Sequence, residues 1–497
     1  MAVLCLLTFS AAFPANDLYK HFRALPVRQL WDDEVPKYDQ LSAVEREKQV
    51  ALVRAIGVKF ANSQDAAAQR EVAHWLLGLL DDQSEKVRRY ATAALPKVGG
   101  VGGAASEQKL LELLANSSQE REKASIAAAL SKIGGAATLS AVRASSADQP
   151  LAAFDEQRVR ARVARKVPSA ILLDALLPAE ACEGLRLHLR CRRGLEEAVA
   201  DELRDATSRT TPPPLPLRCV QVRSGCVVAD VTGSFSLGQL HRLRCFDTVG
   251  FVLRSGGDVA GEREKGGDGD DALAAAIASP RCEQIMRACT EGSLRYRLSV
   301  DNIGAGGGGQ GGSSRVARDV KALDARIARI AKIAYARNPR VLNDARQATW
   351  MVDVPSAGAS RGAAELRPRL SPNPRLRYQT ATFYAGAHPP LAASMARMAR
   401  PWQPNEIVWD PFCGTAMELI ECALASPRSV TRLIGTDLDS AALKVAEANV
   451  AAAARCGELH TSPPPSTFIA CDFRDGAEHV PEIRDAQVSL MISHDLP

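Results

Sequence analysis

The sequence predicts a protein of several domains, with helical repeats first, an α+β domain next, and an α/β domain with a parallel sheet last. Three observations predict this order. Two helical segments repeat, a stretch near residue 185 changes from strand to helix periodicity, and three successive strands near the C-terminus each end in an aspartate. A chain of 497 residues is long enough for about three domains of ordinary size.

The composition is sufficient for buried cores. The small net charge predicts that any strongly basic surface is confined to a part of the molecule. Apolar residues make up 46% of the chain and aromatic residues only 5%, so we expect cores of Ala, Leu and Val. A formal charge of +5 does not separate polyanion binding from simple solubility. Lys and Arg nevertheless cluster between Arg186 and Arg193 and between Lys321 and Arg346. No apolar run reaches the roughly 20 residues of a membrane span, so no membrane partner is predicted.

The cysteines and the N-terminus bear on where the protein works. None of the 12 cysteines forms a C-x-x-C pair, which predicts no metal site and reduced thiols in an intracellular compartment. Residues 1–20 begin with a short apolar core followed by small residues, as in a targeting segment. The stretch from Ser10 to Ala15 is similar to plastid-targeting junctions. The two hypotheses for the location of the protein are therefore the plastid and the cytoplasm. The alternative is that this segment is an apolar helix of the first domain.

Residues 41–145 are predicted to be helical and repetitive. Two segments share a buried helix, a polar turn and a second helix with small residues, and they end at Gly100 and Gly135, an offset of 35 residues. We expect the glycines to stop each helix in the left-handed conformation. The pattern resembles HEAT repeats, which bury their apolar faces against neighbouring repeats. This predicts a scaffold for a protein partner or RNA, with an ordinary helical bundle as the alternative.

Residues 183–370 are predicted to form an α+β domain. An alternating strand from Leu185 is followed by a helix from Leu195, two strands around Ser224-Gly225, a helix over 235–244 and a strand over 249–253. This order is typical of the ferredoxin-like, split βαβ plan. Two glycine-rich stretches, 256–271 and 304–314, lack the strand, helix and Lys-Ser/Thr pair of a phosphate-binding loop. We interpret them as loop insertions.

Residues 378–497 carry the strongest pattern. A strand ends at Asp410, a tight turn follows over 411–417, and later strands end at Asp437 and Asp472, before a fourth over 487–493. An acid after the second strand suits a ribose diol, because a carboxylate accepts two hydroxyl hydrogen bonds. The pattern predicts an open parallel sheet with a ligand across its carboxyl edge. An α/β domain without a nucleotide is the alternative.

The segment Asp410-Pro-Phe-Cys-Gly-Thr415 resembles the first motif of S-adenosylmethionine (SAM)-dependent RNA methyltransferases with a THUMP domain. The resemblance is to the ribosomal RNA large-subunit guanine-N2 group and related transfer RNA enzymes. The stretches Leu189–Glu197, Glu365–Leu370 and His388–Met395 are similar to other parts of that family. The similarity runs over 185–493, and it makes the last domain a Rossmann-like methyltransferase half-domain behind a THUMP-like region.

The resemblance implies SAM-dependent methylation of structured RNA, with a guanine amine of ribosomal RNA as the first target and transfer RNA as the second. Two alternatives stay open. One is a catalytically inactive RNA-binding or ribosome-assembly scaffold, and the other is a methyltransferase that acts on a protein or small molecule. A protein partner is expected only through the helical repeats.

The resemblance also assigns residues to SAM. Asp437 is expected to hold the ribose, Asp472 the adenine amine, and Phe473 to lie beside the ring. The residues expected to line the methionine end are Asp410, Gly414 and Thr415, and Phe412 is also expected to bind the cofactor. Structural roles are expected for His388 in the preceding loop and for Cys413 in the turn.

The chain departs from the family pattern at two places. Ala416 stands where the family usually has glycine, and its methyl group is expected to crowd the ligand or be tolerated. After the fourth strand the family has Asn/Asp-Pro-Pro-aromatic, whereas this chain reads Ser493-His-Asp-Leu-Pro497. Asp495 is therefore the candidate catalytic acceptor. The missing motif and strands predict a truncated domain, with a natural half-domain as the alternative.

Overall fold

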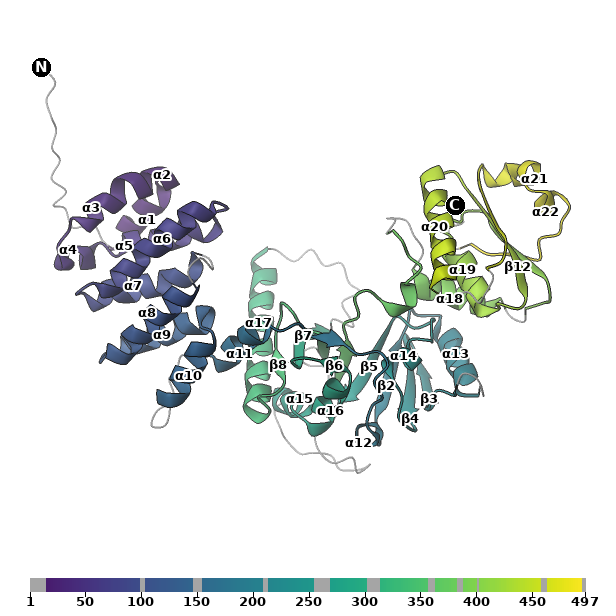
Figure 1. Cartoon of the computed structure of the whole chain (residues 1–497), viewed down its shortest axis with the longest axis horizontal. Coiled ribbons are helices and arrows are strands. Elements are labelled where there is room, and N and C mark those ends of the chain that lie inside the picture. Colours follow the sequence, from purple (N-terminus) through teal and green to yellow (C-terminus); the bar gives the residue numbers. More distant parts are fainter. Residues whose placement is uncertain are drawn as a thin grey trace, which may run out of the picture. The chain divides into compact units, whose positions relative to one another are not determined.

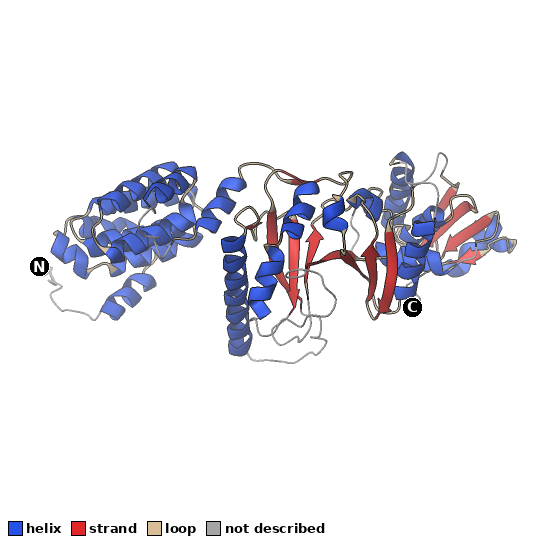
Figure 2. Cartoon of the chain, turned by 90° about the horizontal axis from the view of Figure 1, so that it is seen from below, coloured by secondary structure: helices blue, strands red, loops and turns tan. Residues whose placement is uncertain are grey.

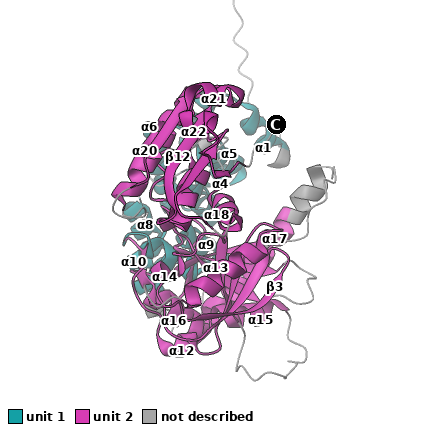
Figure 3. Cartoon of the chain, turned by 90° about the vertical axis from the view of Figure 1, so that its right-hand side faces the viewer, with its two compact units in different colours: residues 1–167 teal, residues 168–497 magenta. Residues whose placement is uncertain are grey.

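The computed structural model describes most of the chain and separates it into two compact units, residues 1–167 and 168–497 (Figure 3). The described residues are 15–98, 103–145, 154–208, 213–253, 269–301, 313–355, 363–381, 388–399, 402–456 and 463–493. Most of the expected targeting segment, most of both glycine-rich stretches, and Asp495 lie outside these ranges.

The described part of the first unit consists of helices and connecting loops (Figure 2), which confirms the prediction of a helical N-terminal region. Helices begin at Ala15, well before the predicted start at Leu41, and continue to Ala164. The α-helices are α1 Ala15–Ala24, α2 Val27–Gln29, α3 Val35–Asp39, α4 Ala43–Lys48, α5 Ala51–Lys59, α6 Ala66–Gly78, α7 Glu85–Ala94, α8 Gly103–Asn116, α9 Glu120–Ile133, α10 Ala136–Ser145 and α11 Glu156–Ala164.

The helices α5, α7, α9 and α11 stack in chain order, and α6 and α8 pack against the helices that follow them. α7 begins at Glu85 and α9 at Glu120, which is the 35-residue offset of the sequence. Gly57 lets α5 approach α7, because a Cβ atom at this position would lie 2.7 Å from that of Ala94. Arg88 on α7 pairs with buried Glu122 on α9 at 2.6 Å. Assignment to the HEAT family stays a prediction.

The expected left-handed glycine cap is wrong at Gly134. This residue follows α9 with φ −61° and ψ 154°, which is extended backbone open to any residue. Glycine is required there for a different reason, since a Cβ atom would lie 2.5 Å from Thr138 Oγ1 and 2.6 Å from the Leu130 carbonyl oxygen. Glycine is needed after this helix because the neighbouring atoms leave no room for a Cβ atom, and not because the backbone is left-handed.

In the second unit, eight of the described strands form one sheet in the order β3-β4-β2-β5-β10-β9-β7-β8. These strands are β2 Arg186–Arg190, β3 Leu217–Arg223, β4 Cys226–Val231, β5 Thr248–Leu253, β7 Arg295–Asp301, β8 Leu342–Asn343, β9 Trp350–Pro355 and β10 Ala364–Pro368. A short pair, β1 Ala170–Ile171 with β6 Thr290–Glu291, lies outside it. The accompanying helices are α12 Ala179–Cys182, α13 Glu196–Ser208, α14 Leu237–Leu240, α15 Gly269–Ile277, α16 Pro280–Ala288 and α17 Ser313–Arg337.

The elements from β2 to β5 follow the predicted order of strand, helix, strand, strand, helix and strand, and all their strand pairs are antiparallel. The second helix is shorter than predicted, because it ends at Leu240. Beyond it, the amides of Arg244 and Cys245 donate to the Glu202 carboxylate and not to helix carbonyls. The ferredoxin-like and THUMP-like assignments of the region stay predictions.

The helices and one face of the eight-stranded sheet share a single apolar core. Leu187, Phe251, Leu366, Val352 and Leu298 all lie in this core, and the pairing register places them on the same face. Side chains alternate along a strand, so the residues between them point to the opposite face.

The C-terminal part is an α/β domain (Figure 1). Its four described strands are parallel and ordered β13-β12-β11-β14. The strands are β11 Glu406–Asp410, β12 Val430–Asp437, β13 Ser466–Ala470 and β14 Leu490–Met491, and the helices are α18 Pro389–Met398, α19 Met417–Ala425, α20 Ser440–Arg455, α21 Gly476–His479 and α22 Pro481–Arg484. β11 and β12 end at Asp410 and Asp437, as predicted, whereas β13 ends at Ala470, two residues before the predicted end at Asp472. The fourth is shorter than predicted, since only Leu490 and Met491 pair with β11.

A buried cluster joins this α/β domain to the sheet domain. Arg244 donates to both carboxylate oxygens of Glu421 on α19 at 2.7 and 2.9 Å, and the Tyr378 hydroxyl donates to the same carboxylate at 2.7 Å. Glu421 is 2% exposed. Nearby, Arg397 of α18 pairs with Asp201 and Asp205 of α13.

We predict that Glu421→Ala lowers the free energy of unfolding by about 3–5 kcal/mol, because it leaves a buried guanidinium without its charge partner. Chemical denaturation monitored by circular dichroism measures the change. Glu447→Ala on the exposed side of α20 is the matched control and should change stability by less than about 0.5 kcal/mol. Equal effects of the two substitutions would contradict a structural role for the cluster.

Candidate functional site

The carboxyl ends of β11 and β12 bring two of the predicted site aspartates to one edge of the sheet. Asp410 ends β11 and is 1% exposed, and its Oδ1 accepts the Phe412 amide at 3.0 Å. Asp437 ends β12, and its carboxylate accepts the Gly414 amide at 2.8 Å. Neighbouring parallel strands end at the same edge, so this arrangement follows from the strand order.

The turn between β11 and α19 is held in a conformation that L-residues rarely adopt. Gly414 has φ +48° and Ala416 has φ +64°. The Cys413 amide donates to the Thr436 carbonyl at 3.0 Å, and the Ala416 amide donates to the Cys413 carbonyl at 2.7 Å. Ala416 is fully buried in the apolar cluster of the domain, so its methyl group packs inward. Because Ala416 has a Cβ atom and a positive φ, its backbone is strained by an amount on the order of 1–2 kcal/mol relative to glycine.

Asp437 also fixes the start of the next helix. Its Oδ1 accepts the Asp439 amide at 2.8 Å, while Asp439 in turn caps α20 through the Ala441 amide. Each carboxylate oxygen of Asp437 thus accepts one backbone amide, and each has a second lone pair. The carboxylate is oriented by the protein and retains capacity for hydroxyl donors.

Asn449 is a site residue that the sequence reasoning missed. It lies on α20 with no exposed surface, and its Oδ1 accepts both the amide and the hydroxyl of Thr380 at 2.8 Å. Its Nδ2 donates to the Thr415 carbonyl at 3.1 Å. The side chain therefore ties the turn to the segment that precedes α18. An asparagine within an otherwise Ala-rich helix was the available signal, because an amide in an apolar interior needs partners.

The end of β13 contributes an acid and an aromatic ring. The Phe473 ring lies 5.0 Å from that of Phe412, and Phe473 is 40% exposed. Both oxygens of Asp472 accept hydrogen bonds from Arg474, which lower the pKa of this carboxyl to about 2. Asp472 is therefore ionised at every physiological pH, and its partner is an exposed side chain.

The structure also locates the two residues expected to be structural. Cys413 is buried, and its sulfur would lie 2.6 Å from a Cβ atom at Gly435, so it packs between the turn and β12. Burial, with the nearby Asp410 and Asp437 charges, raises the pKa of the Cys413 thiol far above its ordinary value. His388 precedes α18 and lies 3.5 Å from Asp247. Burial lowers the pKa of His388, against the attraction of that carboxylate.

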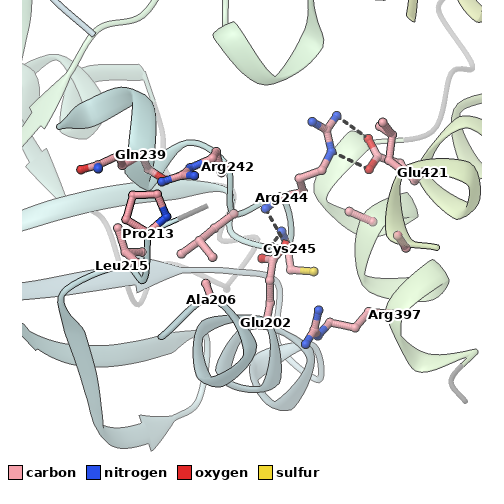
Figure 4. Close-up of a pocket in the computed structure, with 14 residues that line it drawn as sticks. Glu202, Ala206, Pro213, Leu215, Gln239, Arg242, Arg244, Cys245, Arg397 and Glu421 are labelled. Carbon is pink, nitrogen blue, oxygen red and sulfur yellow. Dashed lines mark hydrogen bonds and ion pairs between the residues drawn. The ribbon is translucent and has the colours of Figure 1, made fainter. Parts of the chain in front are cut away.

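A cavity of about 140 Å³ lies at the junction of the sheet domain and the α/β domain (Figure 4). Its lining includes Glu202, Arg242, Arg397 and Glu421, and Figure 4 shows the Arg244–Glu421 pair at one side. Burial raises the pKa of the Glu202 carboxyl, although two backbone amides donate to it. This cavity adjoins the C-terminal end of α19, whereas the turn precedes the N-terminal end, so the two are separate features.

We predict that Asn449→Ala lowers the free energy of unfolding by about 2–4 kcal/mol, because it leaves the carbonyl of buried Thr415 without its donor, removes both hydrogen bonds to Thr380 and opens a small cavity. Thermal or chemical unfolding measures this. Thr380→Val, which removes only one of the three bonds, should cost about 1 kcal/mol. If the two variants are equally stable, Asn449 does not hold the turn.

The methyltransferase-domain family described as RMKL-like matches residues 377–462, a segment that contains Thr380, the turn, Asp437 and Asn449. Comparison with the curated proteins gives no match.

Solved structures with some likeness include TrmN from Thermus thermophilus, 22% identical over 60% of this chain and 75% of that one, with a TM-score of 0.37. A predicted N6-adenine-specific DNA methylase from Listeria monocytogenes is 16% identical over 59% and 76%, also with a TM-score of 0.37. The rRNA methyltransferase aviRa from Streptomyces viridochromogenes is 20% identical over 20% and 54%, with a TM-score of 0.16. TM-scores this low do not establish the activity of this chain. The family match shows that residues 377–462 of this chain are similar to a methyltransferase domain.

Proposed function

We propose that the chain is a SAM-dependent RNA methyltransferase. Its first candidate target is a guanine amine of ribosomal RNA, and its second is transfer RNA. The observation that carries the proposal is the coincidence of the methyltransferase-domain match with the ordered turn. The matched residues 377–462 include both ends of the Gly414–Asp437 hydrogen bond and all partners of Asn449.

The residues at the sheet edge fit SAM. Asp437 offers an oriented carboxylate to a ribose diol, as an acid at the end of the second strand does in nucleotide-binding folds. Leu438, 78% exposed, and Phe473 provide apolar surface after β12 and β13, which suits a flat ring. We propose that Asp472 meets the adenine amine and that Asp410, Phe412, Gly414 and Thr415 surround the methionine end. SAM would supply an electrophilic methyl group.

The contribution of the chain to the reaction would be positioning. A base must leave its stack to reach a pocket at the sheet edge. Orientation of its exocyclic amine toward the methyl group then accounts for much of the rate, and a nearby acceptor takes the proton. We propose Asp495 as that acceptor. Cys413 takes no part as a nucleophile, because transfer to an amine needs none and its thiol is buried.

We predict that the purified chain binds SAM in isothermal titration calorimetry and that Asp437→Ala weakens binding at least about tenfold, since hydrogen bonds to a charged group contribute about 1.5–3 kcal/mol. Asp485→Ala, at an exposed acid of the same domain, is the control and should bind as the wild type does. Absence of SAM binding, or equal affinities of wild type and Asp437→Ala, would contradict the assignment.

The substrate is tested with SAM that carries a labelled methyl group. Transfer to ribosomal RNA, with N2-methylguanosine in the nuclease digest, is the expected result. Label in transfer RNA alone would identify transfer RNA, the second candidate, as the substrate. Label in a protein or small molecule would favour a methyltransferase that acts on that class of substrate. SAM binding without transfer to any of these would favour the RNA-binding scaffold.

A further inference from the structure

Among the described residues, the helices of the sheet domain share a core with one face of its eight-stranded sheet, and the opposite face is rich in arginine. We call it the open face and define it by the strand residues that alternate with the core residues. Among the strand residues that the structure describes, its exposed or half-buried arginines are Arg186, Arg190, Arg218, Arg223, Arg297 and Arg367. Arg295 also lies on this face, but it is buried and pairs with Asp344. The acids with described side chains on this face are Asp230, Asp353 and Glu365.

Each of these three acids is paired with arginine. Asp230 accepts Arg186 at 3.0 Å and Arg218 at 3.4 Å, and Asp353 accepts Arg367. Glu365 accepts Arg190 at 2.8 Å. Among the described side chains of this face, there are two exposed or half-buried arginines for every acid, so the pairing leaves excess positive charge.

The buried Glu365 also contacts a histidine. His188 Nδ1 lies 2.6 Å from a Glu365 carboxylate oxygen, and the Arg223 guanidinium lies 3.0 Å from His188 Nε2. Burial opposes ionisation of Glu365, but His188 and Arg190 outweigh it and hold the pKa of this carboxyl below its ordinary value. One buried carboxylate therefore orients Arg190 directly and contacts Arg223 through His188.

Several of these arginines, paired or not, are accessible to a partner. Arg218 is 70% exposed and Arg186 39%, and Arg223 and Arg297 are also exposed. From β3 to β7 there are six strand spacings in the sheet order, which amounts to about 29 Å of arginine-bearing surface. A small anion contacts only one or two guanidinium groups, so a face of this width fits a continuous polyanion.

The composition of the open face decides which nucleic-acid feature it fits. Single-stranded RNA is recognised by bases that stack on aromatic side chains. Among the described strand residues, however, no Phe, Tyr or Trp points to the open face. Phe251, Tyr296 and Trp350 all lie on the opposite, helix-covered face with no exposed surface. Arginine without aromatic residues suits the phosphates of a duplex.

The second basic cluster that the sequence suggested is less available. Arg326 and Arg329 of α17 both pair with Asp270, Arg337 pairs with Asp271, and Arg340 pairs with Glu283. The charge between Lys321 and Arg346 is therefore largely neutralised within the protein, whereas that of the open face is in excess.

We infer that the open face binds the phosphate backbone of a double-stranded RNA segment, independently of its sequence. The inference rests on the proposed function only in taking RNA as the polyanion. The binding needs neither SAM nor a methyl acceptor.

The test uses the full chain without SAM and fluorescence anisotropy with a labelled RNA hairpin of about 16 base pairs, a length that shape-specific duplex binders span. The triple variant Arg218→Ala, Arg223→Ala, Arg297→Ala should bind about tenfold or more weakly. Its plot of log affinity against log salt should be shallower by roughly 0.9 for each lost phosphate contact. The control triple Arg121→Ala, Arg287→Ala, Arg484→Ala removes the same charge elsewhere and should bind as the wild type does.

Three outcomes would overturn the inference: equal affinities of the open-face triple and the control triple, equally tight binding of single-stranded RNA of the same length, or displacement of the hairpin by polyglutamate at equal charge concentration. Thermal unfolding of both triples verifies that they are folded. Failure of SAM binding with duplex binding intact would reject the proposed function alone, whereas loss of duplex binding with SAM binding intact would reject this inference alone.

Discussion

The buried Glu421 carboxylate is the interaction on which the second unit depends. It accepts Arg244 from the sheet domain and Tyr378 from the segment before α18, and it sits on α19. The same helix begins at the turn that carries Gly414 and Thr415. One short helix therefore holds the candidate cofactor turn at its first residue and the domain junction near its last.

Charge is used in two ways in this unit. Where it is buried, as at Glu421, the charged group is held by partners from other segments, because an unpaired charge in an apolar interior is costly. Where it is exposed, as at Arg218 and Arg223, it is left in excess and can attract a polyanion. The buried, paired groups fix the geometry of the candidate site. The exposed arginines give the sheet domain a positively charged surface.

In the proposed function, the sheet edge of the α/β domain and the open face of the sheet domain have different roles. The sheet edge in the α/β domain presents Asp437 and Phe473 to a nucleoside, while the open face presents guanidinium groups without aromatic rings. Backbone contacts position an RNA, and only contacts to a base can select it. We therefore expect selection of the target base at the sheet edge and not on the open face.

The sequence by itself determined the helical first unit, the strands that end at Asp410 and Asp437, and the turn between them, because these follow from periodicity over a few residues. It could not determine that Arg190 meets Glu365, that Arg244 meets Glu421, or that Asn449 reaches both Thr380 and Thr415. The partners in these contacts are far apart in the chain, and only packing selects them. For the same reason the basic cluster over 321–346 read as a charged surface, whereas the fold pairs much of it with Asp270, Asp271 and Glu283. Local sequence fixes how a strand or helix forms, but the tertiary structure decides which charges remain free.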